Sequence, residues 1–366
     1  MTEQQHEPEA RGGGGGETAR AVGLYFFSAL QEESDDAAAF DLLLDAARAA
    51  DRAGLDFVWV PERHFTRFGG GHPNPAVLAA AIAVVTRNLR IRAGSVVLPL
   101  HDPLRVAEEW SVVDNLSHGR VEISAATGWN PRDFVLAPGD YRRRAARATE
   151  HLRTVRQLWS GGEITREGPD GAEYRVRTYP RPVQPVLPYW ITAAGNPATF
   201  EYAGEAGASL LTSYGLFSHD ELAERIGLYR RAFAAHHGGH GRVCLMVHAA
   251  IGGQGADTRR LAREPLRRYL ASYLGQQDSA TDPALAAKRL DFAVHRYLRG
   301  RSLIGDRAEA TPILTRIFEV GADEVACLVD FGLPRDSVLE TVAALAELRA
   351  EFRRGTGGTV RPAAHS

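Results

Sequence analysis

The chain has 366 residues, of which 44% are hydrophobic, and its formal net charge at pH 7 is −2. This composition allows a large buried core but gives no positive surface that would attract nucleic acid or an anionic membrane. No uninterrupted apolar stretch reaches the roughly 18 residues of a membrane span, and the polar N-terminus does not resemble a signal peptide. The two cysteines lack metal-ligand or redox spacing, so we expect a cytoplasmic protein with reduced thiols.

The first 19 residues are polar and include five consecutive glycines, so they cannot bury enough apolar surface to fold. We expect a disordered tail at 1–19, a single folded domain at 20–352, and a second disordered tail at 353–366.

From Arg20 onward, short apolar runs alternate with longer helical patterns, and this pairing occurs eight times. The runs are apolar throughout, as burial on both faces of a parallel sheet requires. The count predicts a (β/α)8 TIM barrel. An open doubly wound sheet is the alternative, but it would usually carry a glycine-rich fingerprint after its first strand, which is absent here. The expected strands are 21–27, 55–60, 91–100, 119–128, 188–195, 208–214, 242–251 and 324–332.

Two intervals are too long for simple loops. Residues 161–187, after the fourth helix, alternate like a hairpin and end on prolines. Residues 254–323, before the eighth strand, contain further helical patterns. We expect both insertions to cover the mouth of the barrel.

The second expected strand ends on Glu62, Arg63 and His64, followed by "FTRFGGG". Parallel barrels carry their chemistry at the carboxyl ends of the strands, so these side chains should face a pocket. His64 is the candidate catalytic residue, because imidazole changes charge near neutral pH. A capping or loop histidine is the alternative, and on position alone the two interpretations are about even. The following glycines allow a mobile flap.

The ends of strands three and four read "GSVVLP" and "AATGWN". Small side chains there would let a planar ring system approach the backbone, with Trp129 as a wall. Ordinary barrel packing explains Ala125 and Ala126 at least as well.

The fifth strand is followed by "AGNPATF", in which proline at the first helical position predicts a helix with exposed N-terminal amides. Such an end binds phosphate, with Asn196 and Thr199 adding donors. A simple N-cap is the alternative and the commoner outcome. His236, His237 and His240 fall in a glycine-rich turn, so we expect a solvated turn there and no metal site.

Several stretches resemble the bacterial luciferase-like, flavin-dependent monooxygenases: "DFVWVPERHF", "AGSVVLPLHDPLRVAEEWSVVDNLSHGRVEISAATGWNPRDF", "TYPRPVQP" and "TAAGNPATFEYAGEAGASLLTSYG". The resemblance runs from about Val22 to Leu348, and "DNLSHGR" is its most specific part. Further stretches, such as "GWNPRDFVLAP" and "ADEVACLVDFG", resemble a subgroup from natural-product biosynthesis. That subgroup more often has histidine at the position of Asn130.

The resemblance implies site residues position by position. His64 matches the active-site histidine, and Gly94 with Ser95 matches a place where some members have a non-proline cis peptide beneath the flavin ring. The reactive cysteine that luciferase has beside the flavin is absent here. Trp129 and Asn130 are candidate substrate-pocket residues. The implied cofactor-binding residues are Gly94, Ser95, Ala126, Thr127, Gly195, Asn196 and Thr199.

The resemblance also implies an activity. Such enzymes take reduced FMN from a separate flavin reductase and transfer one oxygen atom from O2 to a substrate. Here the substrate would be a secondary-metabolite intermediate, either free or tethered to a carrier protein, and we expect a homodimer. Two alternatives stay open: a hydride-transfer oxidoreductase that uses a deazaflavin, and a flavin-binding protein without catalytic activity.

Overall fold

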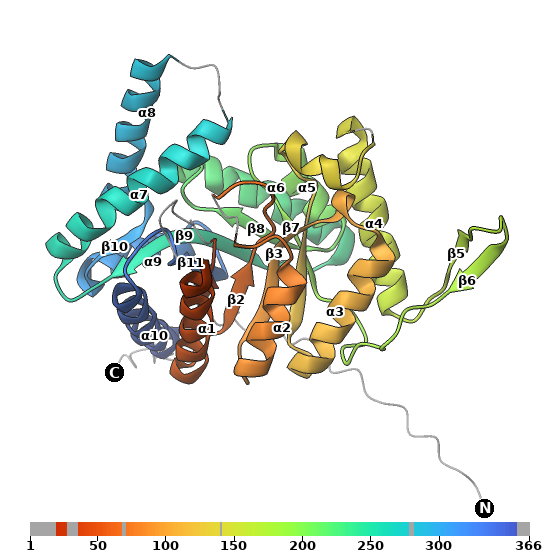
Figure 1. Ribbon diagram of the computed structural model, residues 1–366. Coiled ribbons are helices and arrows are strands. Elements are labelled where there is room, and N and C mark those ends of the chain that lie inside the picture. Colours follow the sequence, from red (N-terminus) through yellow and green to blue (C-terminus); the bar gives the residue numbers. More distant parts are fainter. Residues whose placement is uncertain (1–19, 28–35, 68–70, 140, 278–281, 357–366) are drawn as a thin grey trace, which may run out of the picture.

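The computed structural model describes residues 20–27, 36–67, 71–139, 141–277 and 282–356. Eight parallel strands close into a barrel, because β8 pairs with β9 and β11 pairs with both β9 and β1. Helices surround this ring (Figure 1), so the predicted TIM barrel is confirmed. The barrel strands are β1 (Ala21–Tyr25), β2 (Phe57–Val60), β3 (Arg90–Val97), β4 (Val121–Ala126), β7 (Tyr189–Thr192), β8 (Ser209–Ser213), β9 (Val243–Ile251) and β11 (Glu324–Leu328).

The helices start where the sequence places caps. Four of the described helices begin at a proline that directly follows an Asn or Asp, whose side chain accepts a hydrogen bond from the first-turn amides. Two others begin with a full capping box. The helices are α1 (Asp36–Ala53), α2 (Pro75–Val85), α3 (Pro103–Ser117), α4 (Arg144–Trp159), α5 (Pro197–Glu205), α6 (His219–His237), α7 (Gly255–Gln277), α8 (Pro283–Arg296), α9 (Arg307–Glu319) and α10 (Arg335–Thr356).

The expected tail boundary at residue 353 is wrong, because α10 continues to Thr356. Its last turn carries Arg353, which pairs with Asp56 at 2.8 Å and so ties the helix end to the barrel. The remaining tail residues, 1–19 and 357–366, lie outside the described part of the chain.

The hairpin predicted after the fourth helix is present as β5 (Ile164–Glu167) and β6 (Glu173–Val176). It does not cover the mouth as expected, but extends away from the barrel beyond α4 (Figure 1). The physical reason is its composition: its residues are mostly exposed and polar, so it has no apolar face to bury.

The second insertion forms α7, α8 and the short strand β10 (Leu303–Gly305), which pairs with β9. Tyr269 of α7 packs edge-on against Phe27, just beyond β1, and His248 of β9, with ring centroids 5.4 and 4.6 Å apart. This insertion therefore reaches the carboxyl end of the barrel. No helix in the described ranges is long and apolar enough to cross a bilayer.

The amino end of the barrel is closed by a buried arginine. The Arg92 side chain forms ion pairs with Glu122 and Glu324, and its guanidinium lies 4.1 to 5.1 Å from three aromatic ring centroids. A buried charge is tolerated only when it is paired in this way, so this end is a packed plug. Both cysteines, Cys244 and Cys327, are free, and both are buried.

Candidate functional site

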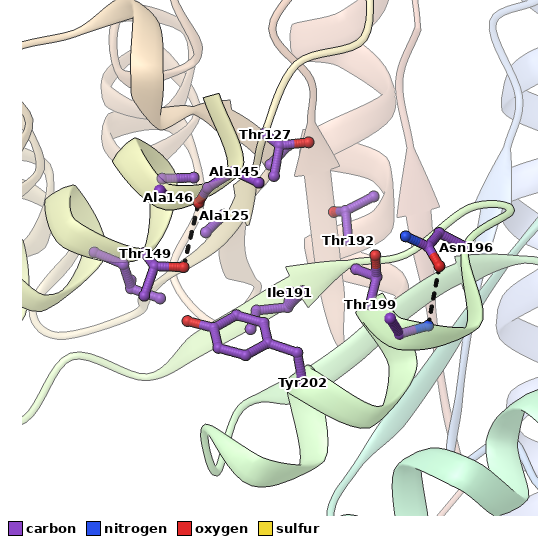
Figure 2. A pocket seen from close by; sticks show the side chains of 14 residues that line it. Ala125, Thr127, Ala145, Ala146, Thr149, Ile191, Thr192, Asn196, Thr199 and Tyr202 are labelled. Atoms are coloured by element: carbon purple, nitrogen blue, oxygen red, sulfur yellow. Dashed lines mark hydrogen bonds between the residues drawn. The ribbon is translucent and has the colours of Figure 1, made fainter. Parts of the chain in front are cut away.

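The main cavity of the site lies between β4, β7, α4 and α5 and has a volume of about 330 Å³. Figure 2 shows hydroxyl and small side chains converging on it beside the first turn of α5. We call it the threonine pocket. Its lining consists of Ala125, Ala126, Thr127, Ala145, Ala146, Ala148, Thr149, Leu152, Ile191, Thr192, Asn196, Ala198, Thr199 and Tyr202.

Four of the predicted cofactor residues line this pocket: Ala126, Thr127, Asn196 and Thr199. The Asn196 side chain also caps α5, because its Oδ1 accepts a hydrogen bond from the Ala198 amide at 3.1 Å (Figure 2). Asn196 is therefore an N-cap and also lines the pocket, and phosphate binding at this turn stays a prediction. Gly195 precedes the cap but does not line the pocket.

The predicted cis peptide is present between Gly94 and Ser95. A side chain at residue 94 would not fit, because its Cβ would lie 2.8 Å from Trp59 and 3.1 Å from Tyr25. The Ser95 hydroxyl shares a hydrogen bond of 2.5 Å with Thr192, which lines the pocket. The end of β3 therefore contacts the threonine pocket through one hydroxyl pair.

His64 lies outside the threonine pocket, in a buried group that we call the Glu62 cluster: Glu62, His64 and His101. Glu62 Oε1 accepts hydrogen bonds from His64 Nε2 at 2.8 Å and from His101 Nε2 at 2.6 Å. Its Oε2 accepts one from the Val97 amide at 2.8 Å. Burial opposes the charge on Glu62, but these hydrogen bonds outweigh it and hold the pKa of that carboxyl below its usual range.

Strand β3 links the two parts of the site. Ser95 is bonded to the threonine pocket, while Val97, two residues later, donates to Glu62. The end of β3 therefore contacts both parts of the site: the Glu62 cluster, which contains His64, and the threonine pocket, which contains the predicted phosphate turn.

The predicted substrate-pocket residues lie near Asp133. Asn130 donates to Asp133 at 2.9 Å, and burial raises the pKa of Asp133, although the charges of His64 and Arg63 partly offset it. The Trp129 ring is 43% exposed and carries the Arg63 guanidinium over it, 5.3 Å from the ring centroid. Neither Trp129 nor Asn130 lines the threonine pocket.

Several functional candidates were missed by the sequence analysis. Thr192 was recognisable, because it follows the inward-facing Trp190 by two residues at the end of a predicted strand. His101 follows the third strand within "LPLH", but nothing in the sequence shows that it meets Glu62. Thr149 and Tyr202 lie on helix faces, and only the packing of α4 and α5 brings them to the pocket.

Two further expectations concern the histidines after the sixth helix and the segment after His64. His236 and His237 are exposed at the end of α6, and no group of metal-binding residues is found in the described part of the chain. The expected flap after His64 covers residues 65–71, of which 68–70 lie outside the described residues.

The fold is a closed barrel of eight parallel strands, with a pocket beside the first turn of α5. Residues 21–324 match the family described as luciferase-like monooxygenase, and the chain belongs to that family.

A relative that covers nearly the whole chain is the oxygenase component of flavin-dependent trigonelline monooxygenase from Acinetobacter baylyi. It is 24% identical over 339 residues, which are 87% of this chain and 93% of that protein. The F420-dependent glucose-6-phosphate dehydrogenase of Amycolatopsis mediterranei is 33% identical over 181 residues, 47% of this chain and 53% of that enzyme.

Among solved structures, the oxygenating constituent of 3,6-diketocamphane monooxygenase from Pseudomonas putida, in complex with FMN, superimposes with a TM-score of 0.74. The two sequences are 19% identical, and the superposition covers 91% of this chain and 98% of the diketocamphane monooxygenase chain. This likeness supports the fold.

Proposed function

We propose that the protein is the oxygenase of a two-component system that uses reduced FMN and O2 to insert one oxygen atom into a secondary-metabolite intermediate. The observation that carries this proposal is the threonine pocket, placed at the amide end of α5 in a barrel of this family. A flavin reductase would supply the reduced cofactor, and a cytoplasmic location suits both partners. The proposal includes a substrate that is either free or tethered to a carrier protein.

The residues of the pocket fit the phosphate end of FMN. The helix terminus offers the positive end of a dipole, and the surrounding threonines add hydroxyl donors. Alanines on β4 and α4 leave room for a chain to pass. We therefore assign phosphate binding to the turn of Gly195, Asn196 and Thr199, and contact with the ring system to Gly94, Ser95, Ala126 and Thr127.

When bound, reduced flavin would supply the electrons that activate O2. The chain's own contribution is to hold the reactants, exclude water and move a proton. Val97, Leu100 and Phe134 form an apolar cluster beside the Glu62 cluster, with the Tyr141 ring packed on it, and limit the access of water. His64, buried except for a small part of its ring, is the group that exchanges a proton with the substrate.

We also propose a homodimer that forms through α2. Helix α2 consists only of apolar residues, yet Val77 and Val84 are 65% and 62% exposed. A helix that is apolar on all sides is normally buried. Val84→Glu should shift the molar mass measured by light scattering from dimer to monomer, while Val186→Glu, at an equally exposed valine elsewhere, should leave it unchanged. A monomeric wild-type protein would exclude the dimer.

A deazaflavin-dependent hydride transfer is the second candidate, because the F420-dependent relative shares 33% identity over about half of this chain. Anaerobic fluorescence titration with reduced FMN and with reduced F420 decides which cofactor binds. Admission of ¹⁸O2 then decides the reaction: label found in an organic product, and not in hydrogen peroxide alone, supports the monooxygenase. Tight F420 binding without FMN binding favours hydride transfer, and FMN binding without turnover would leave a flavin-binding protein.

A further inference from the structure

The Glu62 cluster holds two imidazoles on one carboxylate oxygen. The side chain of Glu62 has no exposed surface, and its three hydrogen bonds come from His64, His101 and the Val97 amide. An ionised carboxylate only accepts hydrogen bonds, so each imidazole nitrogen facing it must carry a proton. This requirement fixes a proton on Nε2 of His64 and on Nε2 of His101.

The other ring nitrogen of His64, Nδ1, makes no hydrogen bond to any residue that the structure describes. It is therefore the nitrogen left for the reaction. Its proton state depends on which of the two rings carries the positive charge that balances Glu62.

The surroundings favour the charge on His101. The His101 side chain is 28% exposed and that of His64 is 9% exposed, so water stabilises a cation better on His101. Burial alone would lower the pKa of His101, but the hydrogen bond and charge of Glu62, with the charge of Glu109, raise it. On the side of His64, the Arg63 cation disfavours a second positive charge and the Asp133 carboxylate favours one, so the greater exposure of His101 decides where the charge lies.

We propose that Glu62 and His101 are positioning residues: Glu62 fixes His64 in its neutral Nε2–H tautomer, and His101 carries the balancing proton, so that Nδ1 of His64 is a base. This inference rests on the proposed function only for the statement that His64 takes part in the reaction. The arrangement of protons belongs to the cluster itself.

In this arrangement a proton can enter the cluster at His64 and leave it at His101, and the net charge of the cluster is the same before and after. Nδ1 of His64 takes a proton from an O–H, N–H or C–H group of the substrate, whose bonding electron pair stays on the substrate atom. The His64 ring then becomes a cation on the same carboxylate oxygen as His101. Because His101 is partly exposed, it releases its own proton to water, and the cluster returns to one positive and one negative charge.

The experiment is long-range ¹H–¹⁵N NMR of the full chain labelled at histidine, recorded between pH 6 and 9 without flavin. His64→Gln and His101→Phe assign the two rings, and His236→Gln, on the exposed end of α6, is the matched control. We expect wild-type His64 to show a protonated Nε2 and an unprotonated Nδ1 at pH 7. We expect His101 to be doubly protonated at the same pH.

Two variants test the charge. In Glu62→Gln the hydrogen-bond acceptor remains but its negative charge is lost, so His101 should be neutral at pH 7. If Glu62 acted only as a structural hydrogen-bond acceptor, Gln would replace it and His101 would stay doubly protonated. In His101→Phe the balancing proton should move, and His64 should become doubly protonated. FMN affinity and circular dichroism check that each variant is folded.

A wild-type His64 that is protonated on Nδ1 alone, or doubly protonated beside a neutral His101, would overturn the inference. An unchanged His101 in Glu62→Gln would overturn it too. If the spectra are as expected but His64→Ala transfers oxygen as well as wild type, the inference about protons stands and the proposed role of His64 fails.

Discussion

Substitution of Asn196 by aspartate tests the phosphate site with little cost to the fold. Aspartate caps a helix about as well as asparagine, so the hydrogen bond from the Ala198 amide, 3.1 Å in the structure, should persist. The change adds one negative charge where α5 is proposed to receive the phosphate. Two unit charges about 4 Å apart interact by about 1 kcal/mol in bulk water and about 4 kcal/mol near a protein surface. FMN affinity should therefore fall by roughly 5-fold to several hundred-fold.

The assay is fluorescence titration with FMN and, separately, with riboflavin, which lacks the phosphate. Asn196→Asp should weaken FMN alone and leave riboflavin affinity unchanged, and Asn196→Ser should retain the cap without the added charge. Because Asn196 is exposed, the loss should shrink as salt rises. Equal FMN affinity in wild type and Asn196→Asp would remove the phosphate from this turn, and an equal loss for riboflavin would indicate a damaged fold.

Three further predictions concern the other parts of the site. His64→Ala should keep FMN affinity but lower coupled oxygen transfer by about 10²- to 10⁴-fold, with hydrogen peroxide formed instead, measured as product per O2 consumed; normal coupling would make His64 a loop residue. Gly94→Ala should lower the free energy of unfolding by about 1–3 kcal/mol, because its Cβ would lie 2.8 Å from Trp59, and an unchanged urea midpoint would contradict the packing. His101 should stabilise the fold most at low pH: its pKa is raised by Glu62, so its contribution is complete below the ordinary value near 6.5 and lost as pH rises through the folded value. Glu62→Gln should therefore cost more stability at pH 6 than at pH 9 in urea unfolding, and an equal cost at both pH values would refute the pairing.

The barrel was predictable because its signals are local. Each strand is a short apolar run, and six of the described helices begin at a side-chain cap, so the eight repeats predicted the class and the order of the elements. Six of the eight barrel strands end one to four residues earlier than expected. The position of the hairpin was not predictable, because alternation shows that two strands pair but not what they pack against. The end of α10 was missed because Arg353 reads as a polar tail until its partner Asp56 is known.

The site divides in the same way. The choice of His64 follows from the rule that parallel barrels place function at the carboxyl ends of their strands, whereas Gly94 was expected from the family resemblance. Thr192 and His101 acquire meaning only through partners 97 and 39 residues away, Ser95 and Glu62. No periodicity or spacing encodes a contact of that range, because it is set by how neighbouring strands align in the closed barrel.

The structure gives a physical reason why strand β2 is followed by charged residues. Glu62 is buried at the carboxyl end of β2 because Val97, at the end of the neighbouring strand, provides an amide that would otherwise lack a partner. Once the carboxylate is fixed there, the only stable arrangement brings cationic or N–H donors to its second oxygen, and two imidazoles supply them. One ring, His101, is partly exposed, and the other, His64, faces the interior. A single buried carboxylate thus connects the packing of two strands to the proton state of the residue proposed to act on the substrate.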